Sequence, residues 1–212
     1  MRVFALALVS VSLYAQEAGG LKPGDARPPA TNEKAVIALA RNVQRELIRL
    51  PEYGLFDNLR FGIKGYTVYL RGFASRPTLK STAERVVKGV EGVEKVVNEI
   101  EVLPLSPADD DVRLGVYVAI YGHPALARYN PNRGTPLFPS MTRRNMGITQ
   151  DPPPGFHPIH IIVKNGQVTL EGVVANTGDR TIAELQANSV PGAFSITNNL
   201  IAVSEEGKPK KR

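Results

Sequence analysis

Apolar and polar positions alternate with two different periods in the first part of the chain. Spacings of three and four residues over 33–49 predict an amphipathic helix, which Pro51 ends. A period of two over 59–63, resumed at Val68 after a turn, predicts a hairpin with one apolar face. The apolar positions are Val36, Ala40, Val43, Leu47 and Leu50 in the helix and Leu59, Phe61, Ile63, Val68 and Leu70 in the hairpin.

A second helix and a third strand follow the hairpin. The segment Ser75-Arg76-Pro77 predicts a helix start, with Ser75 as the capping residue and Pro77 in the first turn. The helix is expected to end in the turn over 89–92, and alternation over 96–102 predicts the last strand. A right-handed crossover makes the second and third strands parallel and places both helices on one face.

The same order of elements occurs twice. The run Val68-Tyr69-Leu70-Arg71-Gly72 returns one hundred residues later as Val168-Thr169-Leu170-Glu171-Gly172. The same offset relates Ala83/Ala183, Glu84/Glu184, Val90/Val190, Gly92/Gly192, Val96/Ile196, Asn98/Asn198 and Ile100/Leu200. The first helices instead match at an offset of 73, so the second copy carries 27 additional residues between its first helix and its first strand.

The sequence therefore predicts an α+β protein with two αββαβ domains, each a small three-stranded mixed sheet with two helices on one face. The predicted boundaries are 32–103 for domain 1, 104–107 for the linker, 108–203 for domain 2 and about 126–157 for its insertion. So short a linker predicts a fixed mutual orientation of the domains. Ser106 with Asp109 predicts a capping box, and the acidic run 109–111 suits the dipole of the helix that starts there.

Four polar or glycine positions are expected to determine the fold. Gly72 and Gly172 stand where the second strand of each copy is expected to end without a side chain. Asn98 and Asn198 share the parity of the apolar residues in their strands. Because a buried amide without a partner is costly, each is expected to bond a neighbouring backbone group across the sheet.

Both ends of the chain differ from the repeated pattern. Residues 1–15 combine an initial positive charge, an apolar run and small residues, which predicts a signal peptide cleaved after Ala15 or Ala18. An uncleaved anchoring segment is the alternative. Residues 16–31 and 204–212 show no periodicity and predict a flexible N-terminal segment and a basic flexible tail. The apolar run is too short to span a bilayer, so no transmembrane segment is expected after cleavage.

Composition indicates the cellular compartment and shows how the net charge is distributed along the chain. The sequence has no cysteine, which excludes disulfides and a lipidated N-terminal cysteine and predicts a soluble periplasmic or secreted protein. Arg2 and the tail together account for +3 of the formal net charge of +6, so the body, at +3, is only mildly basic. The tail has two interpretations, contact with an anionic membrane surface or a solvated end.

Residue patterns that would indicate catalysis are missing. There is no Gly-x-Ser-x-Gly turn, phosphate loop or dinucleotide motif, so we expect neither enzyme activity nor a cofactor. His157 and His160 should point to opposite faces of an extended segment, so no metal site is expected and His160 should be an exposed strand residue. The Gly-x-x-Gly form over 89–92 contains Glu91, whose charge is wrong for RNA, and no nucleic-acid partner is expected.

The order of these motifs resembles the BON domain of bacterial envelope proteins. The resemblance rests on Val-x-Leu-x-Gly, helix, Val-x-Gly and a last strand with Asn, in which Gly72 and Gly172 stand at matching places. It covers about 33–103 and 109–203. Tandem-BON proteins include osmotically inducible periplasmic members, and the resemblance implies periplasmic location, phospholipid or envelope association, and chaperone-like binding.

These observations together predict a non-enzymatic envelope protein that contacts anionic phospholipid. The candidate contact residues are Arg128, Arg133, Arg143, Arg144, Tyr117, Tyr121 and Tyr129, which lie in or near the insertion. The alternative is that the arginines belong to a solvated loop and the tyrosines pack in the second core. A periplasmic chaperone or a module that binds envelope proteins through a sheet edge or face is the other functional hypothesis.

Overall fold

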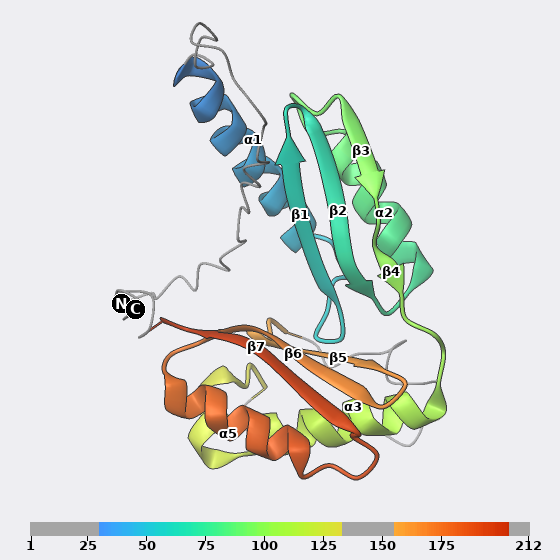
Figure 1. Cartoon of the computed structure of the whole chain (residues 1–212), viewed down its shortest axis with the longest axis vertical. Helices are drawn as coiled ribbons and strands as arrows, with labels where there is room; N and C mark the ends of the chain where they lie inside the picture. Colours follow the sequence, from blue (N-terminus) through green and yellow to red (C-terminus); the bar gives the residue numbers. More distant parts are fainter. Residues whose placement is uncertain (1–29, 133–154, 204–212) are drawn as a thin grey trace, which may run out of the picture.

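The computed structural model describes residues 30–132 and 155–203, which form two domains of the same topology (Figure 1). Domain 1 contains α1 (Ala30–Ile48), β1 (Asn58–Lys64), β2 (Thr67–Ala74), α2 (Pro77–Lys88), β3 (Lys95–Asn98) and β4 (Glu101–Val102). Domain 2 contains α3 (Pro107–Tyr121), η1 (Pro124–Tyr129), β5 (Ile159–Lys164), β6 (Gln167–Val174), α5 (Thr177–Asn188) and β7 (Ser195–Ala202). The predicted signal peptide and basic tail, and most of the insertion, lie outside the described residues.

Both sheets have the predicted mixed topology. β1 pairs antiparallel with β2 and β5 with β6, whereas β3 and β4 lie parallel to β2 and β7 lies parallel to β6. The registers repeat with the sequence, because Leu70 lies opposite Asn98 and Leu170 lies opposite Asn198. The prediction of two α+β domains of αββαβ order is confirmed, and the last strand of domain 1 is divided into β3 and β4.

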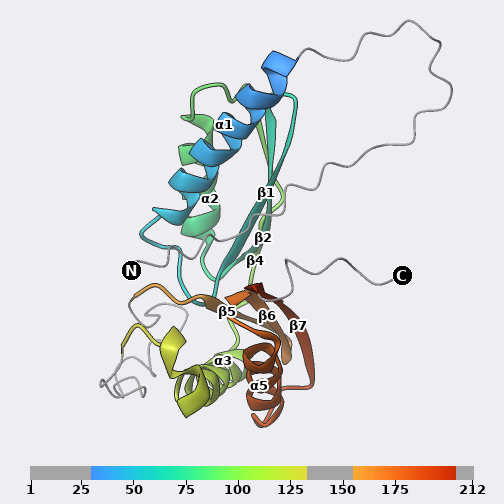
Figure 2. The ribbon, with the colours of Figure 1, turned by 90° about the vertical axis from the view of Figure 1, so that its left-hand side faces the viewer.

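Each domain buries one face of its sheet under its two helices (Figure 2). The core of domain 1 contains Leu39, Val43, Leu47, Phe61, Val68, Leu70, Leu79, Ala83, Val87 and Ile100. The core of domain 2 contains Val112, Val116, Ile120, Leu126, Ile159, Ile161, Val163, Val168, Leu170, Ala183 and Leu200. These sets keep the helical and strand periods that the sequence showed.

The two strand glycines allow a close approach of backbone to backbone. A Cβ on Gly72 would lie 1.9 Å from the carbonyl oxygen of Asn58, and one on Gly172 would lie 2.0 Å from that of Pro158. Both residues also have a positive φ, 109° and 131°, which side-chain-bearing residues rarely adopt. The fold therefore requires glycine here, although both residues lie inside their strands rather than at the ends.

Asn98 and Asn198 join each last strand to the helix above it. Asn98 Nδ2 donates to the Lys80 carbonyl at 3.0 Å and to Glu84 Oε2 at 3.0 Å, and its Oδ1 accepts from Ile100 N. The same three contacts link Asn198 with Arg180, Glu184 and Leu200. The predicted backbone bond exists, but it runs to the helix rather than across the sheet. The recurrence of Glu84 as Glu184 is explained by this contact.

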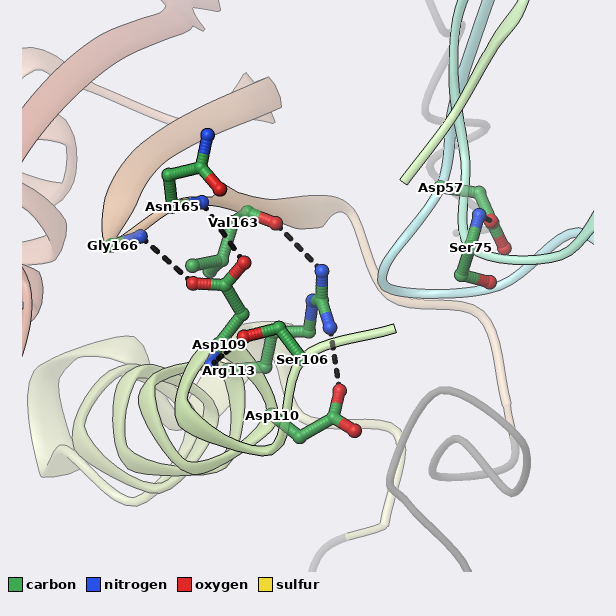
Figure 3. Close-up of polar contacts among 9 residues, drawn as sticks. All are labelled: Asp57, Ser75, Ser106, Asp109, Asp110, Arg113, Val163, Asn165 and Gly166. Atoms are coloured by element: carbon green, nitrogen blue, oxygen red, sulfur yellow. Dashed lines mark hydrogen bonds and ion pairs between the residues drawn. The ribbon is translucent and has the colours of Figure 1, made fainter. Parts of the chain in front are cut away.

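The two helix starts differ from the predicted caps. Ser75 does not cap α2, because the N-cap residue is Arg76, without a side-chain cap bond, and Ser75 is buried with its N–H bonded to Asp57. Ser106 does cap α3, since its Oγ accepts from Asp109 N at 3.2 Å. The Asp109 carboxylate, however, turns to the β5–β6 turn rather than back to the cap (Figure 3).

Asp109 and a buried arginine attach α3 to the first hairpin of domain 2. The carboxylate accepts from Asn165 N at 2.9 Å and from Gly166 N at 2.8 Å. Arg113, fully buried, donates to the Val163 carbonyl at 2.6 Å and to Asp110 at 2.5 Å (Figure 3). The acidic start of α3 therefore serves specific tertiary contacts in addition to the helix dipole.

Candidate functional site

The loop between α1 and β1 of domain 1 inserts two side chains into the core of domain 2. Leu55 and Phe56 are each 1% exposed and belong to the hydrophobic core of domain 2. The carbonyl oxygen of Leu55 accepts from Ile161 N at 2.9 Å, so the loop also bonds the free edge of β5. The two domains are thus packed together, which supports the fixed orientation expected from the short linker.

A buried carboxylate shapes this loop. Asp57 is 1% exposed and accepts from Gly54 N at 2.9 Å and from Ser75 N at 2.6 Å. Burial raises the pKa of Asp57, and the two backbone bonds oppose that rise. Because Ser75 follows β2, these bonds fix the loop against the end of the central strand of domain 1.

Ion pairs join the two sheets on their helix-free faces. Arg60 on β1 lies 3.9 Å from Glu171 on β6, and Lys164 on β5 pairs with Glu101 on β4. The side chains of Arg60, Lys164 and Glu101 are exposed to solvent, whereas that of Glu171 is mostly covered. Exposed pairs of this kind contribute little stability, so the buried loop rather than these pairs holds the domains together.

A cleft of about 550 Å³ lies where the loop, the last turns of α1 and the segment before β5 meet. Its lining combines cationic, apolar and imidazole groups from both domains. The lining residues are Arg41, Gln44, Arg45, Ile48, Tyr53, Gly54, Leu55, Gly155, Phe156, His157 and His160. This is the candidate functional site, called the interdomain cleft below.

Two arginines and two apolar side chains stand open to solvent in this cleft. Arg41 and Arg45 lie one helical turn apart on α1, are exposed, and form no ion pair with any residue that the structure describes. Ile48 and Phe156 are 57% and 64% exposed. Phe156 occupies the position that Phe56 holds in the first copy, where the ring is buried. The cleft therefore offers unpaired positive charge beside uncovered apolar surface.

His160 lies at the contact between the domains. Its ring stacks on Tyr53 with centroids 5.3 Å apart, and its Nδ1 lies 3.1 Å from the carbonyl oxygen of Gly54. A carbonyl only accepts, so Nδ1 carries the proton. Removal from water lowers the pKa of His160 to about 4, and burial likewise raises the pKa of Tyr53. The expectation of an exposed His160 was wrong, because domain 1 covers it.

His157 lies deeper, against the tyrosines of α3. It is 2% exposed and meets Tyr121 and Tyr117 edge-on, with centroids 5.0 and 6.0 Å apart. Its Nδ1 lies 2.9 Å from the carbonyl oxygen of Gly155, and its Nε2 has no hydrogen-bond partner among the described residues. Burial lowers the pKa of His157, so the ring is neutral at pH 7. Both histidines line the same cleft, but their rings turn to different sides as the sequence predicted, His157 to the tyrosines of α3 and His160 to Tyr53 of domain 1.

The tyrosines of the predicted lipid-contact set serve domain 2 itself. Tyr117 and Tyr121 are each 2% exposed in its core, and Tyr121 Oη donates to the Ile159 carbonyl at 2.7 Å. Tyr129 Oη donates to Asp179 Oδ2 at 2.5 Å and accepts from Ala175 N at 2.7 Å. These positions favour the packing alternative that the sequence left open for the tyrosines.

The predicted arginines divide between the described and undescribed parts of the chain. Arg128 lies 3.6 Å from Asp179 and 6.0 Å from the centre of the Tyr129 ring, so it helps attach η1 to the start of α5. Arg133, Arg143 and Arg144 lie outside the described residues. Leu126 is fully buried, so the insertion begins with a segment that belongs to the core.

The residues of the interdomain cleft were not selected by the sequence pattern. Arg41, Arg45 and Ile48 look like the polar side of an amphipathic helix, and Tyr53 looks like a loop residue. Comparison of the copies gives one signal: at the helix offset of 73, Arg41 and Arg45 correspond to the apolar Leu114 and Val118. Nothing local in the sequence shows which residues of the other domain they approach.

Within 30–132 and 155–203, no group of three or more His, Asp or Glu side chains is arranged to hold a metal ion. None of the helices in these same ranges is both long and apolar enough to cross a membrane.

Comparison with known proteins identifies a family for both domains. The family profile described as BON domain matches residues 38–104 and 147–204, together more than half of the chain. No curated protein matches the sequence.

Two similar solved structures concern one protein of Chlamydia trachomatis. CdsD, a structural protein of its type III secretion system, is 16% identical over 80% of this chain and 95% of that chain, with a TM-score of 0.26. Its C-terminal domain is 16% identical over 79% of this chain and 98% of that chain, with a TM-score of 0.25. Likenesses of this size carry no conclusion about function.

Proposed function

Because the chain belongs to the BON domain family, we propose that it is a non-enzymatic envelope protein whose interdomain cleft binds anionic phospholipid. The observation that supports this is the placement of Arg41 and Arg45, which form no ion pair with any described residue, beside the exposed Ile48 and Phe156. A phospholipid offers the matching pair of groups, an anionic phosphate and an acyl chain.

Guanidinium groups suit the phosphate part of such a ligand. Arginine presents planar paired donors that match phosphate oxygens, and it stays charged at any physiological pH. The spacing of Arg41 and Arg45 lets both side chains extend from the same side of α1. Burial of the two apolar side chains against acyl chains would add roughly 1.5–3 kcal/mol for each side chain fully covered.

Location follows from the same proposal. We place the protein in the periplasm or outside the cell, which agrees with the signal-like residues 1–15 and with the usual location of the family. Arg133, Arg143 and Arg144 of the insertion are proposed as additional phosphate contacts. Arg128 would contribute only when it leaves Asp179.

Vesicle binding tests the cleft. The protein should sediment with vesicles that contain anionic lipid and not with purely zwitterionic ones, and added salt should weaken the binding. The double variant Arg41→Gln/Arg45→Gln should lose most of this binding, about thirtyfold if each of the two phosphate contacts contributes about 1 kcal/mol.

The control removes the same charge elsewhere. Lys64 and Lys95 are exposed near the β1–β2 turn, at the end of domain 1 far from domain 2 (Figure 1). The variant Lys64→Gln/Lys95→Gln should bind nearly as well as the wild type. Equal losses in the two variants would show a general charge effect and no cleft site, and undiminished binding by the cleft variant would favour the protein-interaction alternative.

A further inference from the structure

The strand at the outer edge of domain 2 carries no charge. β7 pairs only with β6 within the described sheet, so its other side is a free edge (Figure 2). The segment from Ala193 to Val203 contains no Asp, Glu, Lys or Arg. Exposed edges are usually protected by charged side chains, because an unprotected edge pairs with other strands.

Domain 1 provides an internal comparison at the same positions. Its corresponding edge is divided into β3 and β4 and carries four charged residues. At the offset of one hundred, the pairs are Glu94/Phe194, Lys95/Ser195, Glu99/Asn199 and Glu101/Ile201. Both domains have the same register, so fold alone does not require an uncharged edge. Domain 2 has lost the protection that domain 1 keeps.

The direction of the backbone groups limits where a partner can bond. In domain 1, Glu99 N donates to the Leu70 carbonyl of β2, so even-numbered residues turn their N–H groups to the free edge. On β7 these are Ile196, Asn198, Leu200 and Ala202. The Leu200 N–H is already bonded to Asn198 Oδ1. The half of β7 that begins at Ser195 therefore keeps both of its outward N–H groups, and the Asn198 carbonyl in this half also accepts from Arg180 Nη2 at 3.4 Å.

An exposed aromatic ring stands beside this half of the strand. Phe194 is 83% exposed, although its ring covers Gly166, where a Cβ would lie 2.4 Å from it. Phe194 N donates to the Gly166 carbonyl at 2.9 Å, which fixes the residue at the start of β7. The free edge of β7 therefore begins at an aromatic ring that is fixed in place and open to solvent.

We propose that β7 pairs antiparallel with β7 of a second copy of this chain, with Thr197 opposite itself on a twofold axis. This register places Ile196 opposite Asn198, whose outward backbone groups then bond, and brings Phe194 opposite Leu200. The hydrogen-bonded pairing stops at Ile196 and Asn198, so it does not use the Leu200 N–H, which already donates to Asn198 Oδ1. A threonine pair facing each other across strands is a favourable neighbour pair.

The absence of charge selects the second copy over other partners. Arg180 and Glu184 of α5 bond Asn198, but β7 itself carries no charged side chain, so the strand meets no like charge of its own when it pairs with itself. A twofold contact between identical surfaces is the commonest way in which soluble proteins associate. The resulting dimer keeps both interdomain clefts, because Arg41 and Arg45 lie on α1 and not on β7.

A single cysteine tests the register, because the chain has none of its own. Thr197→Cys should form a disulfide-linked dimer under mild oxidation, since a non-bonded antiparallel pair places the two Cα atoms about 4.5 Å apart. Val97→Cys, at the matching position of domain 1, is the control and should stay uncrosslinked. Equal crosslinking of the two variants, or none in either, would overturn the proposed pairing.

Solution mass tests the association without any crosslink. Light scattering after size exclusion should give the mass of two chains, and Ser195→Lys/Ile201→Glu, which restores the charges of domain 1, should halve it. Both residues are exposed, so the variant should keep the wild-type melting temperature. A wild-type monomer at the highest soluble concentration, or a folded charged variant that remains a dimer, would contradict the proposal.

Discussion

At the scale of single residues, the duplication shows which side chains the fold requires. Glu84 with Asn98 and Glu184 with Asn198 make the same contact between helix and strand. Residues that differ between the copies mark what each domain does separately. Phe56 is buried where Phe156 is open, and Glu101 is replaced by Ile201.

Removing either asparagine should destabilise its domain. Asn98→Ala and Asn198→Ala each remove the bonds between helix and strand and leave the strand N–H of Ile100 or Leu200 without its asparagine partner, and we expect a loss of about 1–3 kcal/mol in urea unfolding. Asn199→Ala is the control, because Asn199 is exposed and, among the described residues, its side chain bonds only Glu171. A cost no greater than that of the control would show that these amides do not hold the helices.

His160 should lower the free energy of unfolding at acidic pH. Its folded pKa of about 4 lies below the ordinary value of 6.5, so the unfolded chain takes up the proton first as the pH falls. The contribution is complete above about pH 6.5 and is lost towards pH 4, amounting to roughly 1–3 kcal/mol. Urea unfolding at pH 7 and pH 4.5 measures this loss.

The variant His160→Phe isolates that effect from other titrating groups. Phenylalanine can still stack on Tyr53 but cannot take up a proton. Its stability should therefore fall less between the two pH values than that of the wild type. Parallel losses in the two proteins would assign the acid sensitivity to other residues, among which His157 is buried and has a lowered pKa.

Some residues could be identified from the sequence and others could not. Gly72 and Asn98 were recognised because they recur in a repeat and break a local pattern. His160, Arg41 and Arg45 were not, because their surroundings come from the other domain. Sequence period reports the neighbours of a residue within its own element, and the interdomain cleft is formed between elements far apart in the chain.

At the scale of elements, helices and strands follow the periods of the sequence closely. α1 and α3 end at matching residues, Ile48 and Tyr121, at the offset of 73 that the apolar pattern gave. The loop over 51–57 was different. It has no period of its own, so its entry into domain 2 could be found only in three dimensions.

The insertion can be shortened more precisely with the structure than with the sequence. Deletion of 126–157 would remove the buried Leu126 and His157, but residues 133–154 lie between ends that meet. A Cβ on Gly155 would lie 3.0 Å from Pro131, so the two ends can be rejoined by a short link. We expect the shortened protein to fold with wild-type circular dichroism and a melting temperature within a few degrees.

The same deletion tests the arginines of the insertion. Binding to anionic vesicles should fall and lose part of its salt dependence, because Arg133, Arg143 and Arg144 are removed. Cleft binding by Arg41 and Arg45 should remain. A folded deletion variant with unchanged binding would remove these arginines from the proposed site and leave the interdomain cleft as the contact.

At the scale of the whole molecule, the two domains share a core. Leu55 and Phe56 come from domain 1 but pack among the buried residues of domain 2. The unfolding of domain 1 therefore exposes part of the core of domain 2. We expect a single cooperative transition in calorimetry, although each domain alone is small.

Truncation of the Phe56 side chain should make the two domains unfold in separate transitions. Phe56→Ala should cost about 3–5 kcal/mol, lost mainly from domain 2, so that domain 2 unfolds first. Hydrogen exchange should then quicken in β5 and β6 before it does in β1 and β2. Leu70→Ala, in the core of domain 1, is the control and should quicken exchange in domain 1 first. The same order of exchange in both variants would contradict the shared core.

The position of Leu55 and Phe56 also sets an order of events in time. A ribosome makes residues 51–57 well before β5 and β6 exist, so the finished first domain presents two large apolar side chains with nothing to cover them. A nascent chain in this state is prone to aggregation until domain 2 has been synthesised. Because synthesis starts at the N-terminus, Leu55 and Phe56 stay uncovered until domain 2 has been made. A pause in synthesis between the two domains would prolong the period in which the chain is prone to aggregation.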